Sequence, residues 1–294
     1  MSTALLAPPS QTIWGHAKQE IARLMRRVLP AATVTLRHVE PGLTLRVNLR
    51  RHVMFWSGGL SRFEPCTVRV LRAAVEPGDT VFDVGGNIGF FSTLLSRYAG
   101  PSGRVLVFEP EPANLGLLRV NLGANHCANV TVVACAAGAE AGTAVFSLDE
   151  ATGATGHLGS GATAGELAVG TGQVRLMETP VETIDRVAES SGSPPDVIKL
   201  DIEGGELQAL TGAVETLRRH RPIVVSELTG ASGVDVVRLL DGLGYSMWDL
   251  ESGRSVAAGE HAFMVVAVPA ERATTPRGQR VRRAVSTNQR TVRR

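Results

Sequence analysis

The chain has 294 residues, enough for one large domain with an added cap, and 44% of them are hydrophobic, an ordinary share for a globular protein. The net charge of +2 is unevenly placed: residues 272–294 carry eight arginines and no acid, which leaves −6 on the rest of the chain. An extended basic surface for nucleic acid is therefore excluded for the body of the protein. Aromatic residues make up only 4%, which argues against base-stacking or sugar-stacking platforms.

The three cysteines, Cys66, Cys127 and Cys135, include no C-x-x-C pair, which argues against a disulfide framework and against a zinc site. No apolar run approaches the roughly 18–20 residues of a membrane span, and the N-terminus lacks a signal-peptide pattern. We therefore expect a soluble, cytoplasmic protein. The abundance of Arg, Ala, Gly and Val over Lys is typical of a GC-rich bacterial source.

The first predicted elements form a cap. Residues 11–28 place apolar side chains at near-helical spacing, which predicts an amphipathic helix. Residues 33–39 and 43–49 alternate apolar and polar around a Pro-Gly turn, which predicts a hairpin.

From residue 79 onward, short apolar strands alternate with helical patterns, as expected for a parallel sheet covered on both faces. The predicted strands are Thr80–Val84, Arg104–Phe108, Asn129–Val133, Val197–Asp201 and Pro222–Glu227, and the predicted helices are Ile88–Tyr98, Ala113–Ala124 and Glu206–Arg219. Two further strands, Tyr245–Leu250 and Ala262–Val268, have no helix between them, so they must pair antiparallel.

Two segments look unstructured. Residues 151–172 contain seven glycines, which predicts a disordered insertion or a mobile loop over a site. The arginine-rich end has no apolar periodicity and is predicted to be a disordered tail. The resulting division is an N-terminal helix, hairpin and lead-in cap at residues 1–76, a ligand-binding α/β domain at 77–269 and the tail at 270–294.

The stretch VFDVGGNIGFF at residues 81–91 is a glycine-rich turn between the first strand and its helix, where a ligand can approach the backbone closely. A nicotinamide or flavin dinucleotide is one candidate. Asp83 weighs against it, because a carboxylate just before the glycines would repel a pyrophosphate by several kcal/mol. S-adenosylmethionine carries an ammonium and a sulfonium and no phosphate, so the same carboxylate attracts it.

The spacing Asp83-x-Gly85-x-Asn87-x-Gly89 suits S-adenosylmethionine, since Asn tolerates the left-handed backbone that a middle glycine would adopt. Glu109 ends the second strand, where a carboxylate can accept both ribose hydroxyls. Cys135 and Ala136 follow the third strand and are small enough for an adenine edge to lie against them. Taken singly, Asp83 as a helix cap and Glu109 as a solvated strand end are ordinary alternatives.

With these residues the sequence resembles the FkbM family of class I methyltransferases. The likeness covers about residues 62–268 and rests on PGDTVFDVGGNIGFFS, VLVFEPEPANLGLLRVNL, and PDVIKLDIEGGELQALTGA followed by RPIVVSEL. It implies a Rossmann-like α/β fold, with a seven-stranded, mostly parallel sheet and an antiparallel last strand. It also implies methyl transfer to oxygen, often on a sugar, polyketide or other secondary metabolite. Gly86 stands where the family more often has alanine.

The fourth strand carries the catalytic candidates. Lys199 and Asp201 lie two residues apart and so share a face, with Asp201 at the carboxyl end where ligands bind in such sheets. Two interpretations stay open. Asp201 and Glu227 can hold Mg²⁺ with Glu203 as third oxygen ligand, or Asp201 can act as a general base without metal. Helix capping is the alternative role for Glu203 and for Glu206, and the preferred one for Glu206.

Two other residues are weaker candidates. His157 lies in the glycine-rich segment and titrates near neutrality, so it is a second possible base, although a lone loop histidine is usually just solvated. Glu64, in SRFEP, resembles the family's upstream Phe/Tyr-Glu pair, which implies a contact with the methionine amine; an exposed acid before Pro65 is about as plausible.

The sequence thus favours a small-molecule O-methyltransferase over three alternatives. An RNA methyltransferase could use the arginine tail to hold phosphate, but the fourth strand ends in DIEG rather than in a box suited to flipped bases. A non-catalytic scaffold predicts loss of Asp83 or Glu109, and both are present. A dehydrogenase is disfavoured by Asp83.

Overall fold

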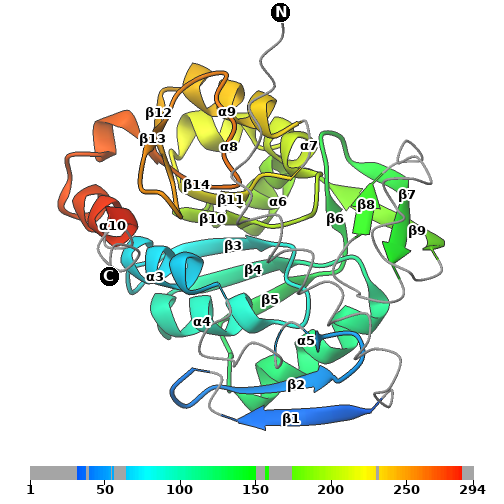
Figure 1. Cartoon of the computed structure of the whole chain (residues 1–294). Coiled ribbons are helices and arrows are strands. Elements are labelled where there is room, and N and C mark those ends of the chain that lie inside the picture. Colours follow the sequence, from blue (N-terminus) through cyan, green and yellow to red (C-terminus); the bar gives the residue numbers. More distant parts are fainter. Residues whose placement is uncertain are drawn as a thin grey trace, which may run out of the picture.

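The computed structural model describes residues 32–37, 40–53, 55, 64–149, 156–158, 174–229 and 232–286. Within them a large central sheet is covered by helices on both faces, with a hairpin at one side and a small second sheet at another (Figure 1). The helix predicted for residues 11–28 lies outside the described residues.

The central sheet has eight strands in the order β13-β12-β14-β11-β10-β3-β4-β5. Its five parallel strands match the predicted ones to within a residue at each end: β3 (Thr80–Val84), β4 (Arg104–Phe108), β5 (Val130–Val133), β10 (Val197–Leu200) and β11 (Ile223–Glu227). The antiparallel last strand is confirmed, since β14 (Met264–Pro269) pairs antiparallel with both β11 and β12 (Tyr245–Asp249). A two-residue edge strand, β13 (Ser255–Val256), raises the count above the predicted seven.

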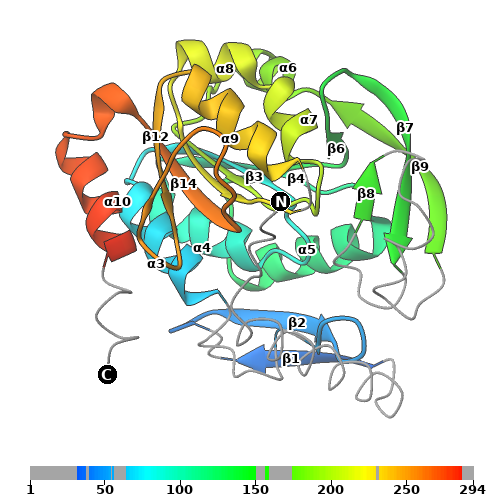
Figure 2. The ribbon, with the colours of Figure 1, turned by 45° about the horizontal axis from the view of Figure 1, so that its top comes forward.

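The two faces of the sheet carry separate hydrophobic layers, because successive residues of a strand point to opposite sides. Val81, Val105 and Val197 pack toward α3 (Pro65–Ala74), α4 (Phe90–Ala99) and α5 (Pro112–Ala124). Phe82, Leu106 and Ile198 pack on the other side. That side is covered by α6 (Ile184–Ser191), α7 (Glu206–Thr211), α8 (Val214–Arg219) and α9 (Gly233–Gly242), as Figure 2 shows. The single helix predicted for residues 206–219 is thus two helices, separated at Gly212.

A four-stranded sheet was not predicted. It has the order β6-β9-β7-β8 and comprises β6 (Ala136–Ala137), β7 (Gly142–Asp149), β8 (Gly156–Leu158) and β9 (Val174–Glu182). The long β7 and β9 pair antiparallel on either side of the glycine-rich segment. The predicted disordered insertion or mobile loop is therefore wrong for residues 156–158, which form a strand against β7; the rest of that segment lies outside the described residues.

The predicted hairpin is confirmed as β1 (Thr33–Arg37) and β2 (Thr44–Asn48), paired antiparallel. It lies beside α5, which presents two asparagine side chains to the backbone of β2. Asn121 Oδ1 accepts from the N–H of Arg46 at 2.6 Å, and Asn125 Oδ1 accepts from the N–H of Thr44 at 3.0 Å. These amides satisfy strand groups that would otherwise need another strand, so the cap is joined to the body by polar contacts as well as by its buried leucines.

The prediction of a disordered tail is wrong for residues 276–286, which form α10 (Pro276–Ser286) against α3. Val281 and Val285 are fully buried there. Arg277 donates to Asp79 Oδ2 at 2.5 Å and to the carbonyl of Ala74 at 2.6 Å. The arginines that suggested a solvated tail therefore serve in part as docking contacts. Residues 287–294 lie outside the described residues.

Candidate active site

A cavity of about 310 Å³ lies at the carboxyl ends of β3, β4, β10 and β11. Of the thirteen residues that the sequence singled out, ten line it: Glu64, Gly85, Asn87, Glu109, Cys135, Ala136, Lys199, Asp201, Glu203 and Glu227. Asp83 and Gly89 do not line it. His157 lies in β8 opposite Ser147, and its side chain is outside what the structure describes.

The glycine turn is packed against the end of β10. Gly85 has φ +87°, and a Cβ there would lie 2.0 Å from the carbonyl oxygen of Asp201, so no side chain fits. Asn87 has φ 47°, as predicted for this position. A Cβ on Gly86 would lie 2.1 Å from Cγ1 of Val107, so the alanine common in the family would not fit here without a shift of that side chain. The turn and the two strand ends thus form one rigid floor.

Glu109 is almost completely buried, and its carboxylate is held by backbone. Oε2 accepts from the N–H of Asn87 at 2.8 Å, and Oε1 accepts from the N–H of Glu111 at 2.8 Å. Burial raises the pKa of Glu109 to about 7, and the two backbone donors oppose that rise. The glycine turn and the second strand end are therefore tied to each other through this one side chain.

Asp83 lies beneath the cavity rather than in its wall. It is fully buried, accepts a hydrogen bond from Ser92 Oγ at 2.6 Å, and has Oδ1 3.4 Å from Lys199 Nζ. Lys199 Nζ also donates to the carbonyl of Gly85 at 3.2 Å and lies 3.3 Å from Asp201 Oδ2. The structure thus differs from the predicted direct contact between Asp83 and a ligand: Asp83 does not line the cavity, and its charge is balanced by Lys199.

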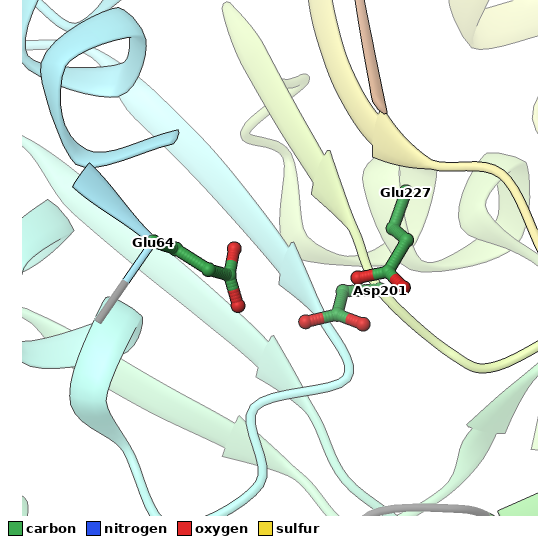
Figure 3. A group of neighbouring side chains, drawn as sticks. All are labelled: Glu64, Asp201 and Glu227. Atoms are coloured by element: carbon green, nitrogen blue, oxygen red, sulfur yellow. The ribbon is translucent and has the colours of Figure 1, made fainter. Parts of the chain in front are cut away.

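The carboxylates of Glu64, Asp201 and Glu227 point toward one another, as Figure 3 shows. One oxygen from each lies within 4.8 Å of the others. In one of the two interpretations left open by the sequence, Asp201 and Glu227 hold a metal with Glu203 as third ligand; the third acid of the group that the structure brings together is Glu64. Glu203 still lines the cavity close by.

The acidic cluster raises its own pKa values. Burial is the largest cause in each case, followed by the charge of Asp201, and the pKa rises to about 7 for Glu64, about 8 for Glu203 and about 9 for Glu227. Lys199 opposes the rise in all three. Near neutral pH the cavity therefore holds carboxyl groups poised to change protonation when a charged ligand enters.

Two remaining candidates are placed clearly. Glu206 accepts from the N–H groups of Gly204 and Ile202, so it holds the loop that leads into α7; it lies in the first turn of that helix, but no side chain caps the helix N-terminus, and the preferred capping role is corrected accordingly. Burial raises the pKa of the Cys135 thiol to about 11, so it is a small neutral wall residue and not a nucleophile.

Phe55, Glu111 and Asn114 are among the wall residues that sequence reasoning missed. Glu111 and Asn114 follow Glu109 closely enough to have been considered. Phe55 comes from the segment after the hairpin, and its ring lies 5.9 Å from that of Phe90. Nothing in the local sequence pattern marks it.

The chemistry of the wall indicates the kind of cofactor that fits. Among the described residues that line the cavity, six are acids (Glu64, Glu109, Glu111, Asp201, Glu203 and Glu227) and one is a lysine, which is already paired. A pyrophosphate would meet several kcal/mol of repulsion here. A cofactor with positive charge and ribose hydroxyls fits this donor set.

The fold is Rossmann-like and of the class I methyltransferase type. Its defining features are a mostly parallel sheet with an antiparallel last strand, a glycine turn after β3 and an acid after β4. The model of the methyltransferase FkbM domain matches residues 83–247, more than half of the chain. The chain belongs to the FkbM methyltransferase family, as the resemblance of its motifs had indicated.

Two methyltransferases are similar to the chain in sequence, and a solved structure is similar in fold. The chain is 28% identical over 202 residues to a hexuronic acid methyltransferase, AglP, of Haloferax volcanii, covering 68% of this chain and 77% of that protein. It is 32% identical over 203 residues to a 31-O-demethyl-FK506 methyltransferase, FkbM, of Streptomyces tacrolimicus, covering 60% and 77%. A solved FkbM methyltransferase from Methylobacillus flagellatus is 21% identical, covers 65% of this chain and 43% of its own, and superposes with a TM-score of 0.42. In the described part of the chain, no helix combines the length and hydropathy that a membrane crossing requires.

We predict that Lys199→Met lowers the free energy of unfolding by about 3–5 kcal/mol, because it leaves Asp83 buried without a counter-charge. Asp83→Asn/Lys199→Met should recover most of this loss, since no fully buried charge is left unpaired; Asp201, the other partner of Lys199, is 25% exposed to solvent. The measurement is urea unfolding followed by circular dichroism.

The same variant should show a characteristic pH dependence. Burial raises the pKa of Asp83 above its ordinary 3.8 and the charge of Lys199 opposes that rise, so the pKa of Asp83 is higher still in Lys199→Met, and the folded variant takes up a proton that the unfolded chain does not. The deficit of Lys199→Met should therefore shrink as the pH falls from about 8 to about 5. An equal deficit at both ends would show that Asp83 is not the source of the cost.

Proposed function

We propose that this methyltransferase transfers the methyl group of S-adenosylmethionine to a hydroxyl oxygen of a small molecule. The proposal rests on the composition of the cavity wall. Glu109 is hydrogen-bonded to the glycine turn, and further acids surround Lys199, which is paired with Asp201. That arrangement suits a cationic nucleoside and opposes a dinucleotide. S-adenosylmethionine supplies an activated methyl group when bound.

The residues that would hold the cofactor follow from their chemistry. Glu109 offers a carboxylate to the ribose hydroxyls, and Gly85 and Asn87 provide a backbone surface that a ligand can approach. Cys135 and Ala136 leave room for the adenine beside β6. Glu64 is available to the methionine ammonium, and the acidic cluster as a whole favours the positive charge.

Asp201 is our candidate for the base that takes the proton of the acceptor hydroxyl. It ends β10, its side chain is 25% exposed at the cavity, and it lies 3.3 Å from Lys199, which fixes its position. The group formed by Glu64, Asp201 and Glu227 is also compact enough to hold a divalent cation. We place the metal-free role of Asp201 first, since the ammonium of Lys199 already supplies positive charge beside it.

The acceptor is proposed from the relatives. One is named for a hexuronic acid and another for 31-O-demethyl-FK506, so a sugar or polyketide hydroxyl is the class to test first. An RNA substrate is less well supported. Arg277 and Arg280 of α10 are engaged with Asp79 and Glu76, which precede β3, whereas the cavity lies at the other end of that strand. A cytoplasmic location, a bacterial source and a role in secondary metabolism stay predictions.

The cofactor proposal is tested by calorimetric titration of S-adenosylhomocysteine and of NADH into the wild-type protein and Glu109→Gln. We expect the nucleoside to bind and NADH not to bind. Glu109→Gln should weaken nucleoside binding about 10- to 100-fold, the usual range for hydrogen bonds to a charged group. Glu140→Gln, an exposed acid outside the cavity, is the matched control and should bind like the wild type. Binding of NADH alone would overturn the proposal.

The base proposal is tested with the first acceptor of this class that gives turnover. We expect Asp201→Asn to lower kcat by about 10²–10⁴-fold, the usual contribution of a positioned base. Asp235→Asn, an exposed acid on α9, is the control. Activity in EDTA should equal that in Mg²⁺. Loss in EDTA with recovery on adding Mg²⁺ would favour the metal alternative.

A further inference from the structure

The segment that follows β2 reaches the wall of the cavity although it lies outside the α/β sheet. Asn48 organises it: the side-chain oxygen accepts from the N–H groups of Arg50 and Arg51, at 3.0 and 3.1 Å, and its own N–H donates to Nδ1 of His52 at 2.9 Å. This capped turn directs Arg51 and His52 toward the start of α5. Phe55, further along, lines the cavity itself.

Arg51 forms an ion pair with Glu111, with Nη2 2.5 Å from Oε1. The side chains are 20% and 7% exposed, so the pair is largely shielded from water. Glu111 is also the residue whose N–H donates to the Glu109 carboxylate at 2.8 Å. One residue therefore connects the guanidinium to the carboxylate that we assign to the ribose.

The guanidinium of Arg51 balances one of two buried carboxylates that lie close together in this part of the wall. Glu109 and Glu111 are both about 95% buried and stand two residues apart. The charge of Glu111 raises the pKa of Glu109, which disfavours the carboxylate form that accepts hydroxyl donors. Arg51 balances Glu111, and removing one partner of such a pair would leave an uncompensated acid beside the ribose site.

The guanidinium is itself firmly placed, because β2 is fixed to α5. Besides accepting from β2, the Asn121 side chain donates to the carbonyls of Arg46 and Ile88, at 3.1 and 2.7 Å. Ile88 belongs to the glycine turn. The cap, α5 and the turn are thus joined by one buried amide.

A second connection between this turn and Glu109 runs through His52 and Asn114. Burial and the charge of Arg51 lower the pKa of His52 to about 4, so its imidazole is neutral in this wall. The Asn114 side chain interacts with both His52 and Glu109. Both residues of the capped turn therefore contact residues that flank the Glu109 carboxylate.

We propose that Arg51 is a positioning residue for the cofactor: by holding Glu111 it fixes the Glu109–Glu111 turn, and with it the carboxylate that binds the ribose. The proposal rests on the proposed function, since it concerns the same cavity. It makes the N-terminal hairpin part of the cofactor site, although the hairpin lies outside the sheet that defines the fold.

The test is calorimetric titration of S-adenosylhomocysteine into the full chain. We expect Arg51→Gln to weaken binding at least tenfold and Arg51→Lys, which keeps the charge, about threefold. In a Glu111→Gln background, where no charge is left to balance, Arg51→Gln should cost less than threefold. Arg37→Gln, an exposed arginine on β1, is the matched control, and thermal unfolding of each variant shows whether it is folded.

The outcomes separate two failures. If the wild-type protein does not bind the nucleoside, the proposed function fails and the role of Arg51 in it fails as well. If the wild type binds and Arg51→Gln binds equally well, only the positioning role is overturned. The same holds if Arg51→Gln lowers the affinity as much in the Glu111→Gln background as in the wild-type background. If Arg51→Gln does not fold, Arg51→Lys is compared in the wild-type and Glu111→Gln backgrounds instead. An equal loss of affinity for S-adenosylhomocysteine in both backgrounds contradicts the proposal.

Discussion

The ammonium of Lys199 is the contact on which the architecture of the site depends. It is buried between β3 and β10 and joins three groups: the carboxylate of Asp83, the carbonyl of Gly85 and the carboxylate of Asp201. Asp83 and Lys199 are direct neighbours in the parallel ladder, so the ion pair fixes the two strand ends relative to each other. Phe91 of α4 covers the ammonium with its ring at 4.9 Å, which keeps water from the pair.

The remaining cavity follows from that floor. The glycine turn packs against the end of β10, and Glu109, which follows β4, accepts a hydrogen bond from the N–H of Asn87 in that turn. The acids of the cluster surround one ammonium group, that of Lys199. Glu64, Asn87 and Glu203 all hold a positive φ at the cavity, a backbone state that is costly for residues with a side chain. Packing around the floor keeps these residues in place, and their carboxyl and amide groups are the ones a cofactor and an acceptor would meet.

Much of this was readable from the sequence because the signals were local. The five parallel strands, the hairpin and the left-handed Asn87 each follow from short patterns of apolar residues, glycine and asparagine. The pairing of Asp83 with Lys199 was not predicted, because a partner 116 positions along the chain cannot be inferred from the glycine motif alone. For the same reason the sequence did not predict that Glu64, rather than Glu203, groups with Asp201 and Glu227. The helix α10 was missed because its two buried valines are surrounded by arginines whose acidic partners are far away in sequence.

In the proposed complex the cofactor meets carboxyl groups around Lys199 whose pKa values are raised to about 7–9. The most direct measurement is the number of protons released on binding at about pH 7.5, from calorimetry in buffers of different ionisation enthalpy. S-adenosylmethionine and S-adenosylhomocysteine should be compared, because they differ in the sulfonium charge. A nearby cation lowers carboxyl pKa values, so we predict that the sulfonium compound releases more protons. Equal release by both ligands would contradict the account.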